Sequence, residues 1–248
     1  MRYFMNLSYR GTPYHGWQVQ ANAHTVQQEV HQALGRLLGQ PTTVTGSGRT
    51  DTGVHARQQV VHFDWPYVLN SNFLYRLNAI LPADISAYRL YEVASDAHAR
   101  FSAYSRSYEY HLHTFKDPFA QDGSYYFRPA LHLHLMQEAA RQLVAYGDHN
   151  YACFSKSGAA TTTYHCRIFR AEWGTKESPL GQRLVFRITA NRFLRGMVRA
   201  IVGTLLEVGT EKMTLEELES VVSSQDRRQA GRSVPAHGLY LTEVVYPF

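Results

Sequence analysis

Residues 42–65 decide the fold, and they read TTVTGSGRTDTGVHARQQVVHFDW. The two ends of this stretch, Thr42–Thr45 and Gln59–Trp65, have the residue types of strands. Between them lies Gly46–Ala56, in which three of the first eight residues are glycine. Glycine permits tight turns and a close approach of one backbone to another. The pattern predicts two strands joined by a structured loop.

A helix is expected on each side of this stretch. Before it, Thr25 followed by Gln28 has the spacing of a capping box, and an apolar stripe at helical spacing runs to Leu38. After it, Ser71 is expected to cap a helix that stops at Pro82. Strands are expected at 3–9, where apolar and polar residues alternate as in a half-buried strand, and at 85–93. The first half therefore has the order β-α-β-β-α-β.

The second half repeats this order. Strands are expected at 108–114, 166–173, 183–190 and 239–246, and helices at 136–144 and 193–208. Thr214 and Glu217 form a second capping-box pattern before a short helix. We therefore predict an α+β fold of two ferredoxin-like β-α-β-β-α-β units, with mostly antiparallel sheets packed around a central cleft. The expected domains are residues 1–103, which carry the glycine-rich loop, and 104–248.

Composition narrows the class of protein. The chain has 248 residues, a formal charge of +5 and 13% aromatic residues. It is too apolar for a disordered chain, and two cysteines cannot build a disulfide framework. It contains neither a run of about 18 apolar residues nor a signal peptide, so we expect a soluble cytoplasmic protein. The basic charge permits a nucleic-acid partner but is also ordinary for solubility.

The loop Gly46–Ala56 fits none of three familiar motifs. A dinucleotide fingerprint needs glycine where Asp51 stands, and a Walker loop needs Gly-Lys-Ser/Thr. Asp51-Thr52-Gly53 matches the triplet of aspartic proteases, which need a second carboxylate; a homodimer is the only source for it. Arg49 instead favours an ionised Asp51. An ordinary glycine turn remains the other alternative.

The segment Gly48-Arg49-Thr50-Asp51-x-Gly53-Val54-His55-Ala56 resembles the signature loop of the tRNA pseudouridine synthase A family. The resemblance covers nearly the whole chain, because five further segments match the family in the same order. These segments are 11–18, 25–27, 98–110, 191–203 and 238–241. Two residues depart from the family pattern: Arg10 replaces the usual Asp, and Ser47 the usual Ala.

The resemblance implies an isomerase that converts uridine to pseudouridine at positions 38, 39 and 40 of the tRNA anticodon stem-loop. The target nucleotide must leave the base stack to be reached. By resemblance Asp51 is the essential carboxylate, acting either as a nucleophile on the sugar or base, or as the base that takes the C2′ proton. No cofactor and no metal are expected.

The resemblance also implies roles for residues around the target base. Arg49 is expected to fill the space of the flipped base and then pair with Asp51 or a phosphate. Tyr108 is expected to stack on the target base, a contact worth about 1–3 kcal/mol. Leu239 is expected to form an apolar wall of the base pocket. His55 is expected to hold the loop rather than to catalyse.

Three arginines are expected at the start of the long helix at 193–208 and on the residue just before it. Arg192, Arg195 and Arg199 stand at i, i+3 and i+7 and would share one helical face. Arg199 is expected to point its guanidinium toward Asp51, and Arg192 and Arg195 to contact RNA phosphates. The expected partners are tRNA and a second copy of the chain, with no DNA and no membrane. An RNA-binding module without catalysis is the competing interpretation.

Overall fold

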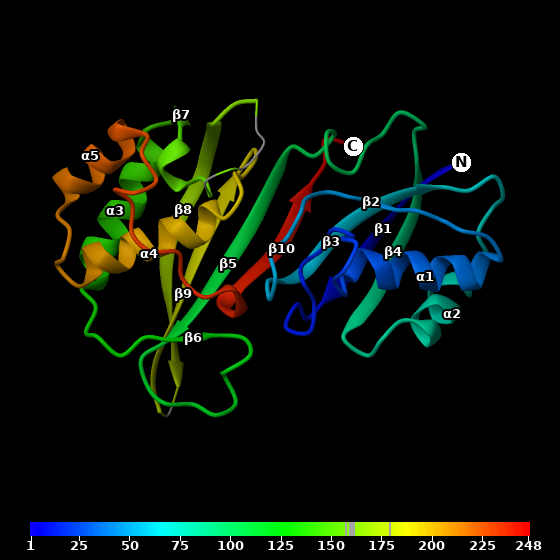
Figure 1. Ribbon diagram of the computed structural model, residues 1–248, viewed down its shortest axis with the longest axis horizontal. Helices are drawn as coiled ribbons and strands as arrows, with labels where there is room; N and C mark the ends of the chain where they lie inside the picture. Colours follow the sequence, from blue (N-terminus) through cyan, green and yellow to red (C-terminus); the bar gives the residue numbers. More distant parts are fainter. Residues whose placement is uncertain (157, 159–161, 179) are drawn as a thin grey trace. The chain divides into compact units, whose positions relative to one another are not determined.

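The computed structural model describes residues 1–156, 158, 162–178 and 180–248 of the chain. In this part the fold is mixed α/β, with mostly antiparallel strands and five α-helices (Figure 1). The chain divides into two compact units. Unit 1 is Met1–Tyr104 together with Tyr240–Phe248, and unit 2 is Ser105–Leu239. The C-terminal segment, which we expected in the second domain, is thus part of unit 1.

Unit 1 is a sheet with two helices. Its elements are β1 (Arg2–Tyr9), α1 (Val26–Leu38), β2 (Thr45–Gly46), β3 (His55–Asp64), α2 (Phe73–Ile80), β4 (Ile85–Val93) and, apart from its first residue, β10 (Leu239–Val245). Strand β1 lies between β3 and β4, antiparallel to both, while β10 runs parallel to β3 and β2 pairs antiparallel with it. The two helices contact each other (Figure 1). The order expected for the first half is confirmed.

Strand β1 is buried on both faces, so the prediction of a half-buried strand is wrong. Phe4 and Asn6, on the face expected to be polar, are 0% and 2% exposed. The C-terminal segment supplies the cover, because the ring of Phe4 lies 5.0 Å from the ring of Tyr246 and 6.0 Å from that of Phe248. Alternation along one strand cannot show that a segment more than two hundred residues away covers its second face.

The ends of the two helices of unit 1 differ in how well they were predicted. The Thr25 hydroxyl accepts a hydrogen bond from the Gln28 N–H and caps α1, as expected. Helix α2 does not begin at a Ser71 cap, because Asn72 holds the capping position and makes no side-chain cap hydrogen bond. Sequence spacing alone left two adjacent polar residues to choose from.

Unit 2 has mostly antiparallel strands and three helices. Its strands are β5 (Ser105–His113), β6 (Tyr125–Tyr126), β7 (Asp148–Asn150), β8 (His165–Ser178) and β9 (Gly181–Ala190). The order β5-β9-β8-β7 is antiparallel throughout, and the short β6 pairs parallel with β5. The strands β6 and β7 were not predicted; each has three residues or fewer, too short for a periodic pattern.

The helices of unit 2 are α3 (Leu133–Ala145), α4 (Met197–Gly209) and α5 (Leu215–Ser224). Helix α3 contacts β8 and both other helices (Figure 1). Helix α4 is buried except at Arg199 and Glu207, which explains its almost continuous apolar sequence. The capping box of Thr214 and Glu217 is confirmed at the start of α5. Among the described residues, no helix has the length and apolar character needed to cross a membrane.

Candidate active site

The loop between β2 and β3 is fixed at its start by one buried glutamine. Gln59, which is 0% exposed, accepts a hydrogen bond from the Ser47 hydroxyl at 2.9 Å and donates one from Nε2 to the Gly48 carbonyl at 2.9 Å. The Ser47 N–H donates to the Val60 carbonyl at 2.7 Å. The first turn of the loop is therefore anchored to β3 by both backbone and side chain.

The middle of the loop is fixed by residues 9–17. The Thr50 carbonyl accepts a hydrogen bond from the Trp17 N–H at 3.1 Å, and the hydroxyls of Thr50 and Tyr9 are hydrogen-bonded at 2.8 Å. The Gly53 N–H donates to the Tyr14 carbonyl at 3.4 Å. The chain around Asp51 is thus held on both sides by the segment that follows β1.

Three glycines allow this close contact. Gly16 has a φ of +89°, and a Cβ on it would lie 2.5 Å from the Thr50 carbonyl oxygen. A Cβ on Gly11 would overlap the Val54 carbonyl, and one on Gly46 would lie 2.6 Å from Nε1 of Trp17. Real Cβ atoms do not approach other atoms this closely. The glycines of both segments therefore permit one backbone to support the other.

Asp51 lies in the part of the loop that these contacts hold. Thr50 and Val54 are buried, Asp51 and Gly53 are half-buried, and Arg49 and Thr52 are exposed. The Val54 N–H donates to the Asp51 carbonyl at 3.1 Å and closes a turn. A carboxylate and a guanidinium two residues apart are therefore presented from a fixed backbone, which suits a catalytic group better than a mobile loop would.

His55 holds the end of the loop. Its Nδ1 accepts a hydrogen bond from the Gly11 N–H at 3.1 Å, and its ring stacks on Tyr240 with centroids 4.6 Å apart. The guanidinium of Arg57 lies over the ring of Tyr240, 5.4 Å from its centroid. Burial raises the pKa of Tyr240, so its hydroxyl stays protonated at neutral pH. His55 is 3% exposed, and its burial and contacts agree with the holding role that we expected.

The segment near the loop carries one further polar pair. The Tyr14 hydroxyl donates to Asp84 Oδ1 at 2.6 Å, and burial together with this hydrogen bond raises the pKa of Tyr14. The ring of Tyr14 is 2% exposed and lies 4.8 Å from that of His24. Tyr14 therefore anchors residues 9–17 to Asp84, the residue before β4, and its hydroxyl stays neutral.

The expected base-contacting residues lie in unit 2. Tyr108, on β5, is half-buried, and the edge of its ring meets Phe193 at a centroid distance of 5.1 Å. Leu239 is the first residue of β10 and is 6% exposed. It follows Gly238, where a Cβ would lie 2.8 Å from the Tyr110 ring. Arg49 and Asp51 thus belong to unit 1, and Tyr108 and Leu239 to unit 2.

The prediction that Arg192, Arg195 and Arg199 share a helical face is wrong. Helix α4 begins only at Met197, because Gly196 adopts a left-handed conformation with φ 71° and breaks the expected helix. Arg192 and Arg195 therefore lie in the segment before α4, and only Arg199 is helical. The Nε of Arg199 donates to the Val234 carbonyl at 2.7 Å.

Arg199 belongs to a contact between α4 and the segment before β10. A Cβ on Gly203 would overlap the Arg232 carbonyl, and the buried Thr204 hydroxyl accepts from the Gly231 N–H at 2.9 Å. The Val234 N–H donates back to the Arg199 carbonyl at 3.2 Å. The helix therefore fixes the chain that leads to Leu239.

Sequence reasoning missed the residues that support the loop. Gln59, Tyr9 and Trp17 were taken only as parts of strands or of a matching segment. Trp17 and Tyr9 both contact Thr50, from 33 and 41 residues earlier in the chain. No local sequence pattern shows a contact over such a separation. The glycines at 11 and 16 were the available signal, since each marks a close approach.

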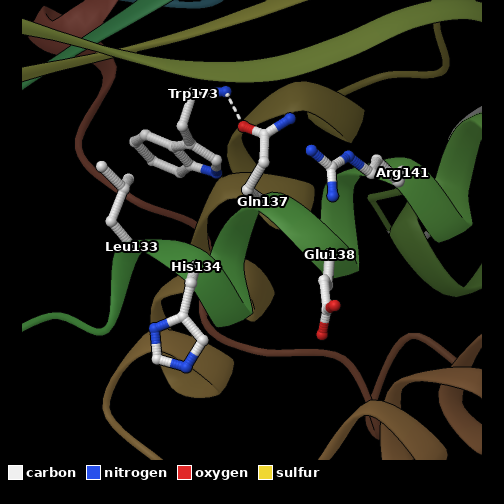
Figure 2. A pocket seen from close by; sticks show the side chains of 6 residues that line it. All are labelled: Leu133, His134, Gln137, Glu138, Arg141 and Trp173. Carbon is white, nitrogen blue, oxygen red and sulfur yellow. Dashed lines mark hydrogen bonds between the residues drawn. The ribbon is translucent and has the colours of Figure 1, made fainter.

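A shallow hollow on unit 2 contains none of the predicted site residues (Figure 2). It lies on α3 and β8 and is lined by Leu133, His134, Gln137, Glu138, Arg141 and Trp173. Oε1 of Gln137 accepts from the Trp173 backbone N–H at 2.8 Å. Among the described residues, no group of three or more His, Cys, Asp or Glu side chains is placed to hold a metal ion.

Comparison with known proteins identifies the family. A family profile described as "tRNA pseudouridine synthase" matches residues 139–247. The chain is 47% identical to tRNA pseudouridine synthase A of Porphyromonas gingivalis, across 99% of this chain and 97% of that protein. It is 47% identical to the protein of the same name from Bacteroides thetaiotaomicron (99% and 91% covered), and 40% identical to that from Bacillus subtilis (99% of both). The chain therefore belongs to the tRNA pseudouridine synthase A family, an isomerase family that acts on tRNA.

Proposed function

We propose that this protein isomerises uridine to pseudouridine in the anticodon stem-loop of tRNA, at positions 38, 39 and 40, with Asp51 as the essential carboxylate. The observation that carries the proposal is the loop itself. Asp51 stands half-buried in a turn whose neighbours Thr50 and Gly53 are hydrogen-bonded to residues 9–17. Full-length similarity to tRNA pseudouridine synthases supports the substrate class.

The reaction rearranges bonds within one nucleotide. The bond from N1 to C1′ breaks, the base turns, C5 bonds to C1′, and the proton of C5 is lost while N1 gains one. The product is an isomer of uridine, so atoms balance without a second substrate. An ionised Asp51 serves either route: it attacks the sugar or base as a nucleophile, or it takes the C2′ proton as a base. Either route needs the nucleotide out of the stack.

The remaining residues are assigned to the RNA. Arg49, exposed and two residues before Asp51, fills the space that the flipped base leaves and then pairs with Asp51 or a phosphate. Tyr108 stacks on the target base, and Leu239 forms the apolar wall of its pocket. Arg199 supports Asp51. Arg192 and Arg195 bind phosphates from the segment before α4. They do not need to share a helical face with Arg199 to do so.

The assembly and location follow the same proposal. Two copies of the chain form a homodimer that grips one tRNA, and the protein works in the cytoplasm without DNA. We propose the ferredoxin-like β-α-β-β-α-β order for both halves of the chain; in the second half β10 would be its last strand, with β6, β7 and α5 as additions. Light scattering at micromolar concentration is expected to give the mass of a dimer; the mass of a monomer would contradict this part.

The experiment is to map pseudouridine on defined tRNA. Unmodified transcripts with uridine at 38, 39 or 40 are incubated with the protein, treated with carbodiimide and read by primer extension. Stops are expected at these uridines and at no other position. A transcript with cytidine at all three positions is the matched control and is expected to give no stop. Modification confined to another arm of the tRNA would contradict the proposed specificity, and no modification would contradict the function.

A further inference from the structure

Tyr9 occupies a particular place beside the loop. It is the last residue of β1, it is 4% exposed, and its ring stacks on Trp17 with centroids 6.0 Å apart. In the register of the sheet it stands opposite Ala56, just past the end of the loop. Its hydroxyl reaches across to the Thr50 hydroxyl at 2.8 Å. Packing of the ring therefore fixes where this hydroxyl lies.

Thr50 is the residue immediately before Asp51 and is 7% exposed. Its carbonyl is fixed by the Trp17 N–H, and its side chain by Tyr9. Backbone and side chain of Thr50 are thus held from one segment, at two points. The direction in which the chain enters Asp51 depends on Thr50, so a hydroxyl that fixes Thr50 also holds the backbone from which the Asp51 side chain extends.

We propose that Tyr9 is a positioning residue for Asp51, acting through the hydroxyl of Thr50. The inference rests on the proposed function, in which Asp51 must meet the sugar or base of a flipped nucleotide. A displacement of about 1 Å at a reacting group lowers a rate by as much as about a hundredfold. Tyr9 has no place in RNA binding under this proposal, so its loss affects the chemical step alone.

The test removes one oxygen atom at a time. Tyr9→Phe keeps the ring that packs on Trp17 and deletes only the hydroxyl, and Thr50→Val deletes the partner hydroxyl. Each is expected to lower the single-turnover rate at saturating enzyme by about tenfold, with the Kd for tRNA and KM unchanged. The double variant is expected to be no slower than the slower single variant, because both changes remove the same hydrogen bond.

Tyr3 offers a matched control on the same strand. Its hydroxyl donates to the Met1 sulfur and the Tyr67 carbonyl, both at 3.2 Å, and its register partner is Phe63 at the far end of β3. Tyr3→Phe also deletes one buried hydroxyl from β1 and is expected to leave the rate unchanged. Thermal midpoints of all variants, measured together, separate a loss of fold from a loss of rate.

Three results would overturn the inference: a wild-type rate in Tyr9→Phe, multiplied effects in the double variant, or an equal loss of rate in Tyr3→Phe. The Asp51→Asn protein, measured in the same assay, distinguishes a wrong role for Tyr9 from a wrong proposed function. An active Asp51→Asn protein contradicts the proposed function itself. An inactive Asp51→Asn protein with an unimpaired Tyr9→Phe protein contradicts only the role of Tyr9.

Discussion

Substitution of Gly16 by alanine tests whether the loop is held by close backbone contact. Gly16 and Gly39 both have positive φ angles, +89° and +75°. A Cβ on Gly16 would lie 2.5 Å from the Thr50 carbonyl oxygen, whereas a Cβ on Gly39 would have nothing within 4 Å. Alanine at either position must adopt the left-handed backbone conformation, which costs free energy. Only alanine at Gly16 must also displace the chain next to Asp51.

The two substitutions are expected to differ by several kcal/mol. The left-handed conformation costs a non-glycine residue about 1–2 kcal/mol, and this is the whole expected cost of Gly39→Ala. Gly16→Ala adds overlap, at about 1–3 kcal/mol. It also weakens the hydrogen bond from the Trp17 N–H to the Thr50 carbonyl, at about 1 kcal/mol. Its total cost is therefore about 3–6 kcal/mol, within the stability of an ordinary domain.

The assay is urea unfolding followed by circular dichroism, together with the single-turnover rate on tRNA. Gly39→Ala is expected to lower the free energy of unfolding slightly and to leave the rate unchanged. Gly16→Ala is expected to lower the free energy of unfolding more and also to reduce the rate. Equal losses of stability in the two variants, or a wild-type rate in a folded Gly16→Ala protein, would show that close contact at Gly16 does not hold the loop.

Three further predictions concern separate parts of the chain. Thr204→Val leaves the buried Gly231 N–H without its acceptor, so the free energy of unfolding should fall by about 1–3 kcal/mol in urea; no change would contradict the contact between α4 and residues 231–234. Burial lowers the pKa of His62 to about 4 from 6.5, so below pH 6.5 the unfolded chain takes up a proton that the folded protein does not. Stability should therefore fall between pH 6.5 and 4, by up to about 1.4 kcal/mol per pH unit, and fall less steeply in His62→Gln; parallel curves would contradict this. Arg49→Ala should lower the single-turnover rate without moving the thermal midpoint, because Arg49 is exposed; a lowered midpoint would show that it supports the fold instead.

Elements with a strong local pattern could be predicted from the sequence. The strand expected at 85–93 is found at those residues, and the expected helix after Thr25 ends at Leu38. Its apolar stripe and its cap both lie within the helix, so local sequence suffices. The start of α4 could not be predicted in this way, because the apolar pattern continues through Gly196 while the backbone there turns left-handed.

In the candidate site, too, the residues that are contiguous in sequence could be predicted and the distant ones could not. The loop with Asp51 could be found because its glycines and charged residues are contiguous in sequence. Its supports could not, because Tyr9 and Trp17 reach Thr50 only after the chain has passed through α1 and β2. A tyrosine at the end of a strand has the same pattern whether its hydroxyl meets water or a threonine.

In the proposed mechanism a single carboxylate, that of Asp51, carries the chemistry. The most direct measurement compares wild-type and Asp51→Asn protein on one unmodified anticodon stem-loop transcript. The pseudouridine formed at positions 38, 39 and 40 and the Kd for the transcript are both measured on the same samples. The substitution keeps the size of the side chain, replaces one acceptor oxygen by an NH2 donor and removes the negative charge. We expect the Asp51→Asn protein to form no pseudouridine and to bind the transcript with an unchanged Kd. Pseudouridine formed by Asp51→Asn at the wild-type rate would contradict this mechanism.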